Sequence, residues 1–188
     1  MIKGLSENRR HPPALEVRGM VTFISKLNKV NLVGVEIGVL YGIHADAMLR
    51  TLSIQKLYLV DPYITYPEYL DITSPFGWNA ERHANTLFQP FQDKIVKLKK
   101  FSAEAVSEIP DELDFVYIDG NHAYEFAKQD IENYWPKLKK GGVLGGHDYY
   151  NQGKAREVKK AVDEFIEKNK LELHTSVGGH ECDWWVVK

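Results

Sequence analysis

Short runs of hydrophobic residues alternate along the chain with segments in which hydrophobic residues recur at helical spacing. The clearest helical face consists of Ala127, Ile131, Tyr134, Trp135 and Leu138. Several of the short runs are hydrophobic throughout, which is typical of strands that are covered on both faces. The pattern predicts strands at 32–37, 57–61, 95–101, 113–119, 142–146, 171–177 and 183–187. It predicts helices at about 15–27, 43–53, 79–91, 102–109, 123–138 and 154–169.

This alternation predicts an α/β fold in which successive strands lie parallel, with their carboxyl ends at one edge of a sheet. The last two strands are joined through Gly178-Gly179, a hairpin signal, so the series is expected to close with an antiparallel pair. Residues 62–78 are rich in proline and aromatic residues and too irregular for a helix. A loop of this length is typical of a lid or binding loop, although a packed aromatic cover fits equally well.

Composition narrows the classes of protein. The 188 residues suffice for one domain with its own core, and the formal net charge of −2 without a basic stripe argues against nucleic-acid binding. The single cysteine, Cys182, allows no intrachain disulfide and favours a reducing compartment. The sequence shows no signal peptide, and no apolar run approaches the ~20 residues that a membrane-spanning helix needs. We therefore expect a cytoplasmic protein without membrane contact.

A glycine-bearing turn follows the first strand. Gly38 allows a tight turn there, and Gly42 allows a close approach of the backbone at the start of the next helix. The spacing is not the G-x-G-x-x-G of dinucleotide-binding enzymes. Glu36 at the strand end would repel a phosphate but suits a ligand that carries an amino group. We also expect His44 in the first turn of that helix, near the cofactor.

Two further polar residues follow the next strands. Asp61 can accept hydrogen bonds from both hydroxyls of a ribose, or it can cap the turn that contains Pro62. Ser102 is expected near an adenine ring, and it is also a plausible N-cap of the helix that follows.

The most informative residues follow the strands at 113–119 and 142–146. Asp119, His122, His147 and Asp148 are expected at one edge of the sheet, where open α/β folds place their chemistry. Simpler roles remain open, because Asp119 could bond the next helix and the others could be turn residues.

The order of these motifs resembles that of class I S-adenosylmethionine-dependent methyltransferases. The resemblance rests on Val35-Glu-Ile-Gly-Val-Leu-Tyr-Gly42, Asp61, Ile118-Asp-Gly-Asn-His122 and Gly141-Gly-Val-Leu-Gly-Gly-His-Asp148. The chain looks most like a small metal-assisted branch that includes macrolide sugar O-methyltransferases and cephalosporin-hydroxylase-like proteins. In motif I, Leu40 stands where a second glycine often falls.

The resemblance implies a Rossmann-like three-layer sandwich with a seven-stranded, mostly parallel sheet of order 3-2-1-4-5-7-6 and an antiparallel last strand. It covers about residues 30–188, so an N-terminal arm and helix at 1–29 would precede one methyltransferase domain at 30–188. It also implies that S-adenosylmethionine is bound by Glu36, Gly38, Gly42, Asp61, Ser102 and Asp119.

The resemblance further implies a divalent cation, Mg²⁺ or Mn²⁺, held by Asp119, His147 and Asp148. His147 falls where the family often has a second acid, and an imidazole shifts the preference away from Mg²⁺. His122 matches the general base and has an ordinary pKa near ~6.5.

These inferences predict O-methylation of a small hydroxylated acceptor, such as a sugar or a polyphenol. A nicotinamide-dependent oxidoreductase and a non-catalytic binding protein remain alternatives, and a homodimer stays open. The predicted lid is aromatic and consists of Tyr63, Tyr66, Tyr69, Phe76 and Trp78.

Overall fold

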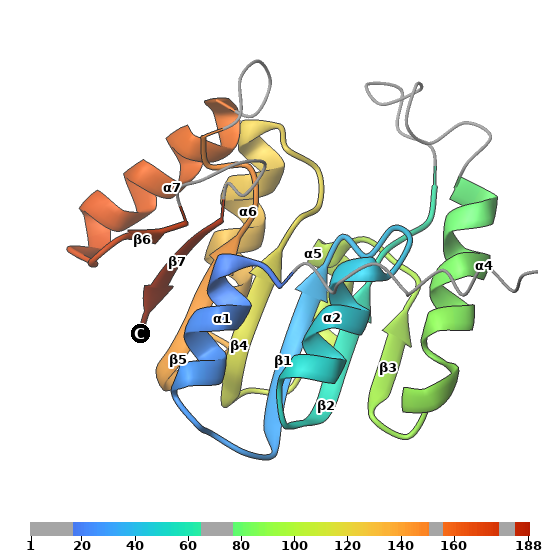
Figure 1. The fold of residues 1–188 in the computed structure, drawn as a ribbon. Helices are drawn as coiled ribbons and strands as arrows, with labels where there is room; N and C mark the ends of the chain where they lie inside the picture. The colour runs from blue at the N-terminus through green and yellow to red at the C-terminus, as the bar shows by residue number, and fades with distance from the viewer. Residues whose placement is uncertain (1–16, 65–76, 151–155, 177–182) are drawn as a thin grey trace, which may run out of the picture.

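The computed structural model describes residues 17–64, 77–150, 156–176 and 183–188 (Figure 1). Seven strands form one sheet in the order β3-β2-β1-β4-β5-β7-β6, which confirms the predicted fold. The strands are β1 Leu32–Ile37, β2 Ile54–Val60, β3 Ile95–Leu98, β4 Leu113–Ile118, β5 Leu138–Gly146, β6 His174–Thr175 and β7 Trp184–Val187. Strands β1 to β5 pair in parallel, whereas β7 is antiparallel to both β5 and β6.

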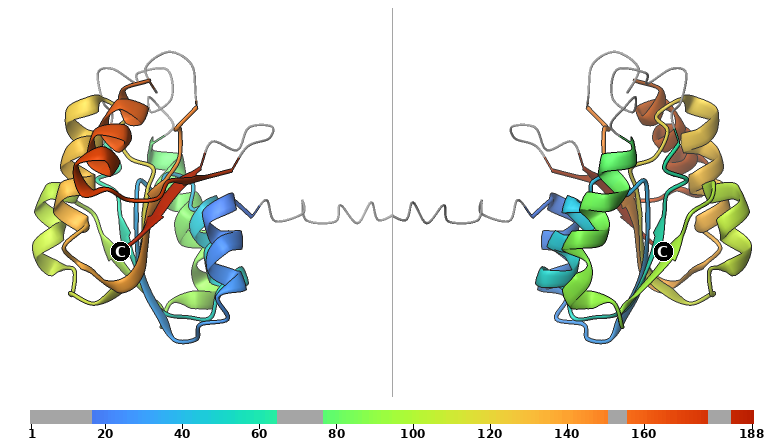
Figure 2. Two further views of the ribbon diagram at one scale, coloured as in Figure 1. Left: turned by 90° about the vertical axis from the view of Figure 1, so that its left-hand side faces the viewer. Right: turned by 90° about the vertical axis from the view of Figure 1, so that its right-hand side faces the viewer.

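Helices cover both faces of the sheet, as the side views in Figure 2 show. One layer holds α1 Gly19–Lys26, α2 Ile43–Thr51 and α4 Gly77–Leu87. The opposite layer holds α5 Ser102–Ala105, α6 Tyr124–Tyr134 and α7 Arg156–Asn169. Short 3₁₀ turns, η2 Gln89–Phe91 and η3 Val106–Glu108, follow α4 and α5.

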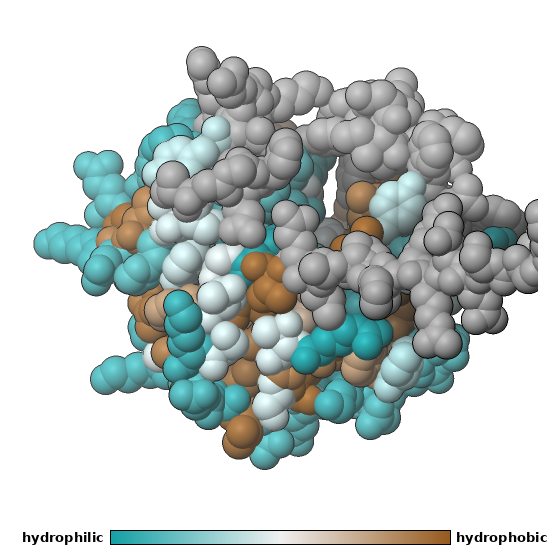
Figure 3. Space-filling view, viewed as in Figure 1, coloured by the Kyte–Doolittle hydropathy of each residue, from teal (hydrophilic) through white to brown (hydrophobic). Residues whose placement is uncertain are grey.

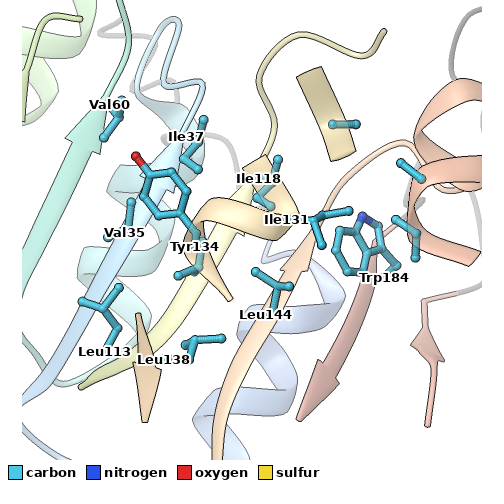
Figure 4. Packing of buried hydrophobic residues seen from close by; sticks show 14 of the residues in the cluster. Val35, Ile37, Val60, Leu113, Ile118, Ile131, Tyr134, Leu138, Leu144 and Trp184 are labelled. Atoms are coloured by element: carbon cyan, nitrogen blue, oxygen red, sulfur yellow. The ribbon is translucent and has the colours of Figure 1, made fainter. Parts of the chain in front are cut away.

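Two hydrophobic clusters fill the spaces between these layers. The cluster on the α6 side includes Val35 and Ile118 of the sheet, Ile131 and Tyr134 of α6, and Trp184 of β7 (Figure 4). The cluster on the other face is built around α1, α2 and α4. Burial on both faces explains why the parallel strands are hydrophobic throughout.

The boundary between α6 and β5 differs from the sequence-based prediction. The helix ends at Tyr134, and Leu138 already pairs with Leu113 of β4. Pro136 explains the early end, since proline lacks an N–H and disfavours a helical conformation in the residue before it. Gly141 therefore lies within β5, at φ 74°, rather than at a helix end.

Other differences are smaller. Strand β2 begins before the predicted segment, and β6 is much shorter than predicted. The N-cap of α5 is Phe101 and not Ser102, which is the first residue of the helix. Several predictions lie outside the described residues: most of the aromatic loop, the Gly178-Gly179 turn and Cys182.

Among the described residues, no helix is long and apolar enough to cross a bilayer. On the face drawn in Figure 3, hydrophilic and hydrophobic residues are interspersed over the part that the described residues form.

Candidate active site

The topology brings the predicted site residues to one edge of the sheet. Because β1 to β5 are parallel, the residues that follow these strands meet at their carboxyl ends. Strand β7 runs in the opposite direction, so it is its beginning, at Asp183, that lies at this edge. The edge carries Glu36, Asp61, Ser102, Asp119, His147, Asp148 and Asp183.

The turn after β1 packs tightly against the end of β4. Gly38 has φ 83°, and a Cβ there would lie 2.0 Å from the carbonyl oxygen of Asp119. Leu40 also has a positive φ, 47°, a backbone conformation that glycine adopts without strain. At Gly42 a Cβ would approach the Phe88 ring to 2.7 Å and Ala84 of α4 to 2.9 Å, so the close approach there is to α4 and the residue that follows it. The glycine turn and Asp119 therefore form one tightly packed unit.

Glu36 and His44 form a buried pair behind this turn. His44 lies in the first turn of α2, as predicted, and its Nδ1 is 2.8 Å from Glu36 Oε1. Burial is the main cause that raises the pKa of Glu36 well above its ordinary value and lowers the pKa of His44 to about 3. His44 is therefore an uncharged imidazole at neutral pH. Glu36 Oε2 is buried and has no partner among the described residues.

Asp61 acts on the glycine turn. Its Oδ2 accepts hydrogen bonds from the backbone N–H groups of Val39 and Leu40, each at 2.9 Å. Its Oδ1 accepts the N–H of Tyr63 at 2.7 Å, which is the turn-capping role considered from sequence. A carboxylate has about four lone-pair positions, so these three bonds leave limited capacity for ribose hydroxyls.

Asp119, His122 and Asp148 form the compact group of the site, which we call the acid–histidine cluster. His122 Nε2 lies 2.9 Å from Asp148 Oδ2 and 3.6 Å from Asp119 Oδ1. One ligand atom from each residue lies within 4.8 Å of the others, a spacing that could hold a metal ion. Asp148 is buried and has φ 66°, a conformation that aspartate tolerates better than most residues.

The electrostatics of this cluster change the expected state of His122. Burial alone would lower the pKa of His122, but its bonds to Asp119 and Asp148 raise it to about 10. Burial alone would raise the pKa of Asp119, but His122 and Arg18 lower it to about 2. His122 is therefore an imidazolium at neutral pH in this arrangement. The ordinary pKa assumed for this residue from sequence was wrong.

His147 lies beside the acid–histidine cluster rather than within it. Its Nδ1 is 3.3 Å from Asp148 Oδ1. The sequence-based prediction combined Asp119 and Asp148 with His147 as metal ligands. In the structure, the group whose spacing suits a cation contains His122 instead of His147.

Ser102 lies beside a buried acid. The hydroxyl of Tyr134 donates to the carbonyl oxygen of Ser102 at 2.9 Å, and a hydrogen bond from Ser102 favours the charged form of Asp130 on α6. Burial nevertheless raises the pKa of Asp130 to about 6. The sequence-based predictions did not include Asp130.

A second group was also missed from sequence because it joins three distant segments. Arg18 Nη1 donates to the hydroxyl of Tyr117 and to Asp119 Oδ2, both at 2.7 Å. The Tyr117 hydroxyl donates to Asp183 Oδ1 at 2.7 Å, and Asp183 Oδ2 accepts the N–H of Met20. The one signal in the sequence is Asp183, a charged residue at the start of a hydrophobic strand.

The site residues fit S-adenosylmethionine. Glu36 Oε2, a buried acceptor without a partner among the described residues, suits an ammonium group of that ligand. The acid–histidine cluster offers two carboxylates and an imidazole, a donor set that first-row divalent cations accept.

Comparison with known proteins also indicates a methyltransferase domain. A family profile described as a methyltransferase domain matches residues 35–149. An uncharacterised protein of Acanthamoeba polyphaga mimivirus is 24% identical over 144 residues, which are 73% of this chain and 61% of that protein. A Sinorhizobium fredii protein is 29% identical over 83 residues, 38% of this chain and 9% of that one. The chain thus spans less than two thirds of either relative.

Solved structures resemble the fold closely. The O-methyltransferase NovP superposes with a TM-score of 0.66 at 18% identity, over 90% of this chain and 79% of that one. The O-methyltransferase from Bacillus cereus in complex with SAH gives a TM-score of 0.58 at 15% identity, over 94% and 84% of the two chains.

The sheet order, the reversed β7 and the glycine turn after β1 together define the class I methyltransferase fold. The chain belongs to the methyltransferase domain family whose profile it matches.

Proposed function

We propose that this protein transfers a methyl group from S-adenosylmethionine to a hydroxyl of a small acceptor, such as a sugar or a polyphenol. The observation that carries the proposal is the acid–histidine cluster, which stands next to the glycine turn at the edge where this family binds its cofactor. Two structural neighbours are O-methyltransferases by name, which supports oxygen as the acceptor atom.

The chain's part in the reaction is to place the acceptor and accept its proton. S-adenosylmethionine supplies the methyl group, and the electron pair of the broken S–C bond stays on sulfur. The new O–CH₃ bond forms as the acceptor loses its proton to a side chain of the site. His122 can take that proton only in its neutral form, which its two carboxylate partners disfavour.

A divalent cation bound at the acid–histidine cluster would resolve this conflict. Asp119 and Asp148 would hold it, and it would lower the pKa of a neighbouring acceptor hydroxyl. Its charge would offset the two carboxylates that keep His122 protonated, and His122 would become available as the base. The same geometry also allows His122 to be a third ligand, and Mn²⁺ accepts an imidazole more readily than Mg²⁺.

Substitution at His122 separates these two roles. If His122 is the base, His122→Ala abolishes methyl transfer but leaves Mn²⁺ affinity, measured by calorimetry, within a few-fold of wild type. If His122 is a ligand, the same variant loses at least about tenfold in Mn²⁺ affinity. Asp148→Asn should weaken Mn²⁺ in both cases, and a wild-type protein that binds no divalent cation would remove the metal from the proposal.

The first test of the function is binding of S-adenosylhomocysteine by calorimetry, followed by transfer of labelled methyl groups to a panel of sugars and catechols. Asp119→Asn should abolish transfer, while Arg50→Gln, on the far end of α2, should leave it unchanged. Absence of S-adenosylhomocysteine binding to the wild type would overturn the proposal. Binding without transfer to any acceptor would favour a non-catalytic role.

A further inference from the structure

Arg18 lies outside the segment that matches the methyltransferase family, yet its side chain reaches the reactive edge. Its Nη1 contacts Asp119 Oδ2 and the Tyr117 hydroxyl, and its guanidinium carbon lies 5.5 Å from the centre of the Tyr117 ring. A quarter of the side chain remains exposed, 25%, so the group is partly accessible from the site. Arg18 is thus a fixed cation beside the reacting groups.

The position of this cation is held from behind. Tyr117 and Asp183 are both fully buried, and their hydrogen bond connects β4 to the beginning of β7. Asp183 also accepts the N–H of Met20 in α1, the helix that begins next to Arg18. The guanidinium therefore loses little conformational freedom when it binds a ligand, which favours affinity.

The guanidinium of Arg18 has N–H donors that are not used in its bonds to Tyr117 and Asp119. Arginine has five N–H donors, and both hydrogen bonds that Arg18 donates to described residues come from Nη1. Within the described part of the chain, Nε and Nη2 have no acceptor. Two parallel N–H groups of this kind match the two oxygens of a carboxylate.

A buried hydrogen-bond acceptor, which could bind a positively charged group of a ligand, lies close enough to Arg18 to feel its charge. Glu36 Oε2 is buried without a described partner, and the charge of Arg18 acts on Glu36, on His44 and on His147. The site therefore contains a cation, Arg18, with unused N–H donors, and a buried acceptor, Glu36 Oε2, on which the charge of that cation acts. This pairing is complementary to an amino-acid zwitterion.

We propose that Arg18 binds the carboxylate of the methionine end of S-adenosylmethionine, while Glu36 accepts its ammonium group. This inference rests on the proposed function and assigns a binding residue to the carboxylate of the cofactor, which the family motifs leave open. Arg18 is then a cofactor-binding residue contributed by the segment before α1, and its bond to Asp119 aligns the cofactor with the reacting edge.

A pair of ligands that differ by one carboxylate tests the proposal. S-adenosylhomocysteine carries it, and S-adenosyl-3-thiopropylamine, the decarboxylated analogue, does not. We expect Arg18→Gln to weaken S-adenosylhomocysteine by about 10- to 100-fold in calorimetry, as for loss of a charged hydrogen-bonded pair. The same variant should change the affinity of the decarboxylated analogue by less than about threefold.

Two further variants serve as controls. Arg18→Lys keeps the charge but loses the two-pronged geometry, so it should recover only part of the affinity, and it replaces Arg18→Gln if that variant fails to fold. Arg50→Gln removes another arginine that is paired with an aspartate, Asp46, away from the site, and both ligands should bind to it as to wild type.

Each other outcome overturns the inference. Equal losses for both ligands would mean that Arg18 acts only by positioning Asp119. Unchanged binding of both ligands, with a raised KM for an anionic acceptor, would assign the carboxylate to the acceptor instead. A wild type that binds neither ligand would remove the proposed function itself, and this inference with it.

Discussion

Gly38 shows how a single residue ties the cofactor turn to the reacting edge. We predict that Gly38→Ala destabilises the protein by about 3 kcal/mol or more, because its Cβ would lie 2.0 Å from the Asp119 carbonyl oxygen. Gly141→Ala is the matched control, since Gly141 also has a positive φ but its Cβ would meet nothing within 4 Å. That variant should lose only about 1 kcal/mol in urea unfolding. Equal losses would show that φ, and not the close approach, makes Gly38 necessary.

Asp130 links the stability of the protein to pH. Its pKa rises from 3.8 to about 6 on folding, so the native state binds a proton more tightly than the unfolded state. The stability that this group contributes is therefore present at low pH and is lost as pH rises from about 4 to about 6. At pH 8, Asp130→Asn should raise the free energy of unfolding by up to about 3 kcal/mol, and at pH 3.5 by almost nothing.

Denaturant titrations at both pH values measure this effect. Glu132→Gln, an exposed change on the same helix, should show no such pH dependence. An Asp130→Asn gain that is the same at pH 3.5 and pH 8 would contradict the assignment.

Among single residues, those that follow predictable strands could be found from sequence. Asp119, Asp148 and Glu36 stand where hydrophobic runs end, and the parallel sheet brings them together. Arg18 could not be found in this way, because its contact with Asp119 spans 101 positions and depends on side-chain packing. The raised pKa of His122 also requires the distances to both acids, which no spacing reveals.

Among the elements, α1 is held to the sheet by a polar contact as well as by its hydrophobic face. We predict that Tyr117→Phe costs about 1–3 kcal/mol, because it leaves a buried oxygen of Asp183 without its donor. Tyr58→Phe in β2, whose side chain is only partly buried, should stay within about 0.5 kcal/mol of wild type. A double-mutant cycle with Asp183→Asn should show strong coupling. Additive losses would argue against the proposed role of this hydrogen bond.

Element boundaries show where sequence reasoning loses its basis. The hydrophobic spacing of α6 continues to Leu138, but the same leucine begins β5. Periodicity alone cannot decide between the two, and the decisive local signal is Pro136. The length of β6 was overestimated, because a hydrophobic run does not reveal how many of its residues pair with a neighbouring strand.

At the scale of the whole molecule, cofactor binding should stabilise the fold. With S-adenosylhomocysteine at about 100 times its Kd, the gain is about 2.7 kcal/mol. For a chain of 188 residues, this corresponds to a rise in Tm of about 5–10 °C. NADH at the same concentration should leave Tm unchanged, and a shift with NADH alone would revive the nicotinamide alternative.

Reversal of the last strand determines where the connection between β6 and β7 begins and ends. Gly146 of β5 and Thr175 of β6 both pair with Trp184, the first residue of β7. The connection from β6 to β7 therefore leaves and re-enters the sheet at the edge that carries the acid–histidine cluster. Residues inserted between Ser176 and Asp183 would therefore enter the chain at that edge, without any change in the pairing of the five parallel strands. Such insertions offer a route to a different acceptor on an unchanged scaffold.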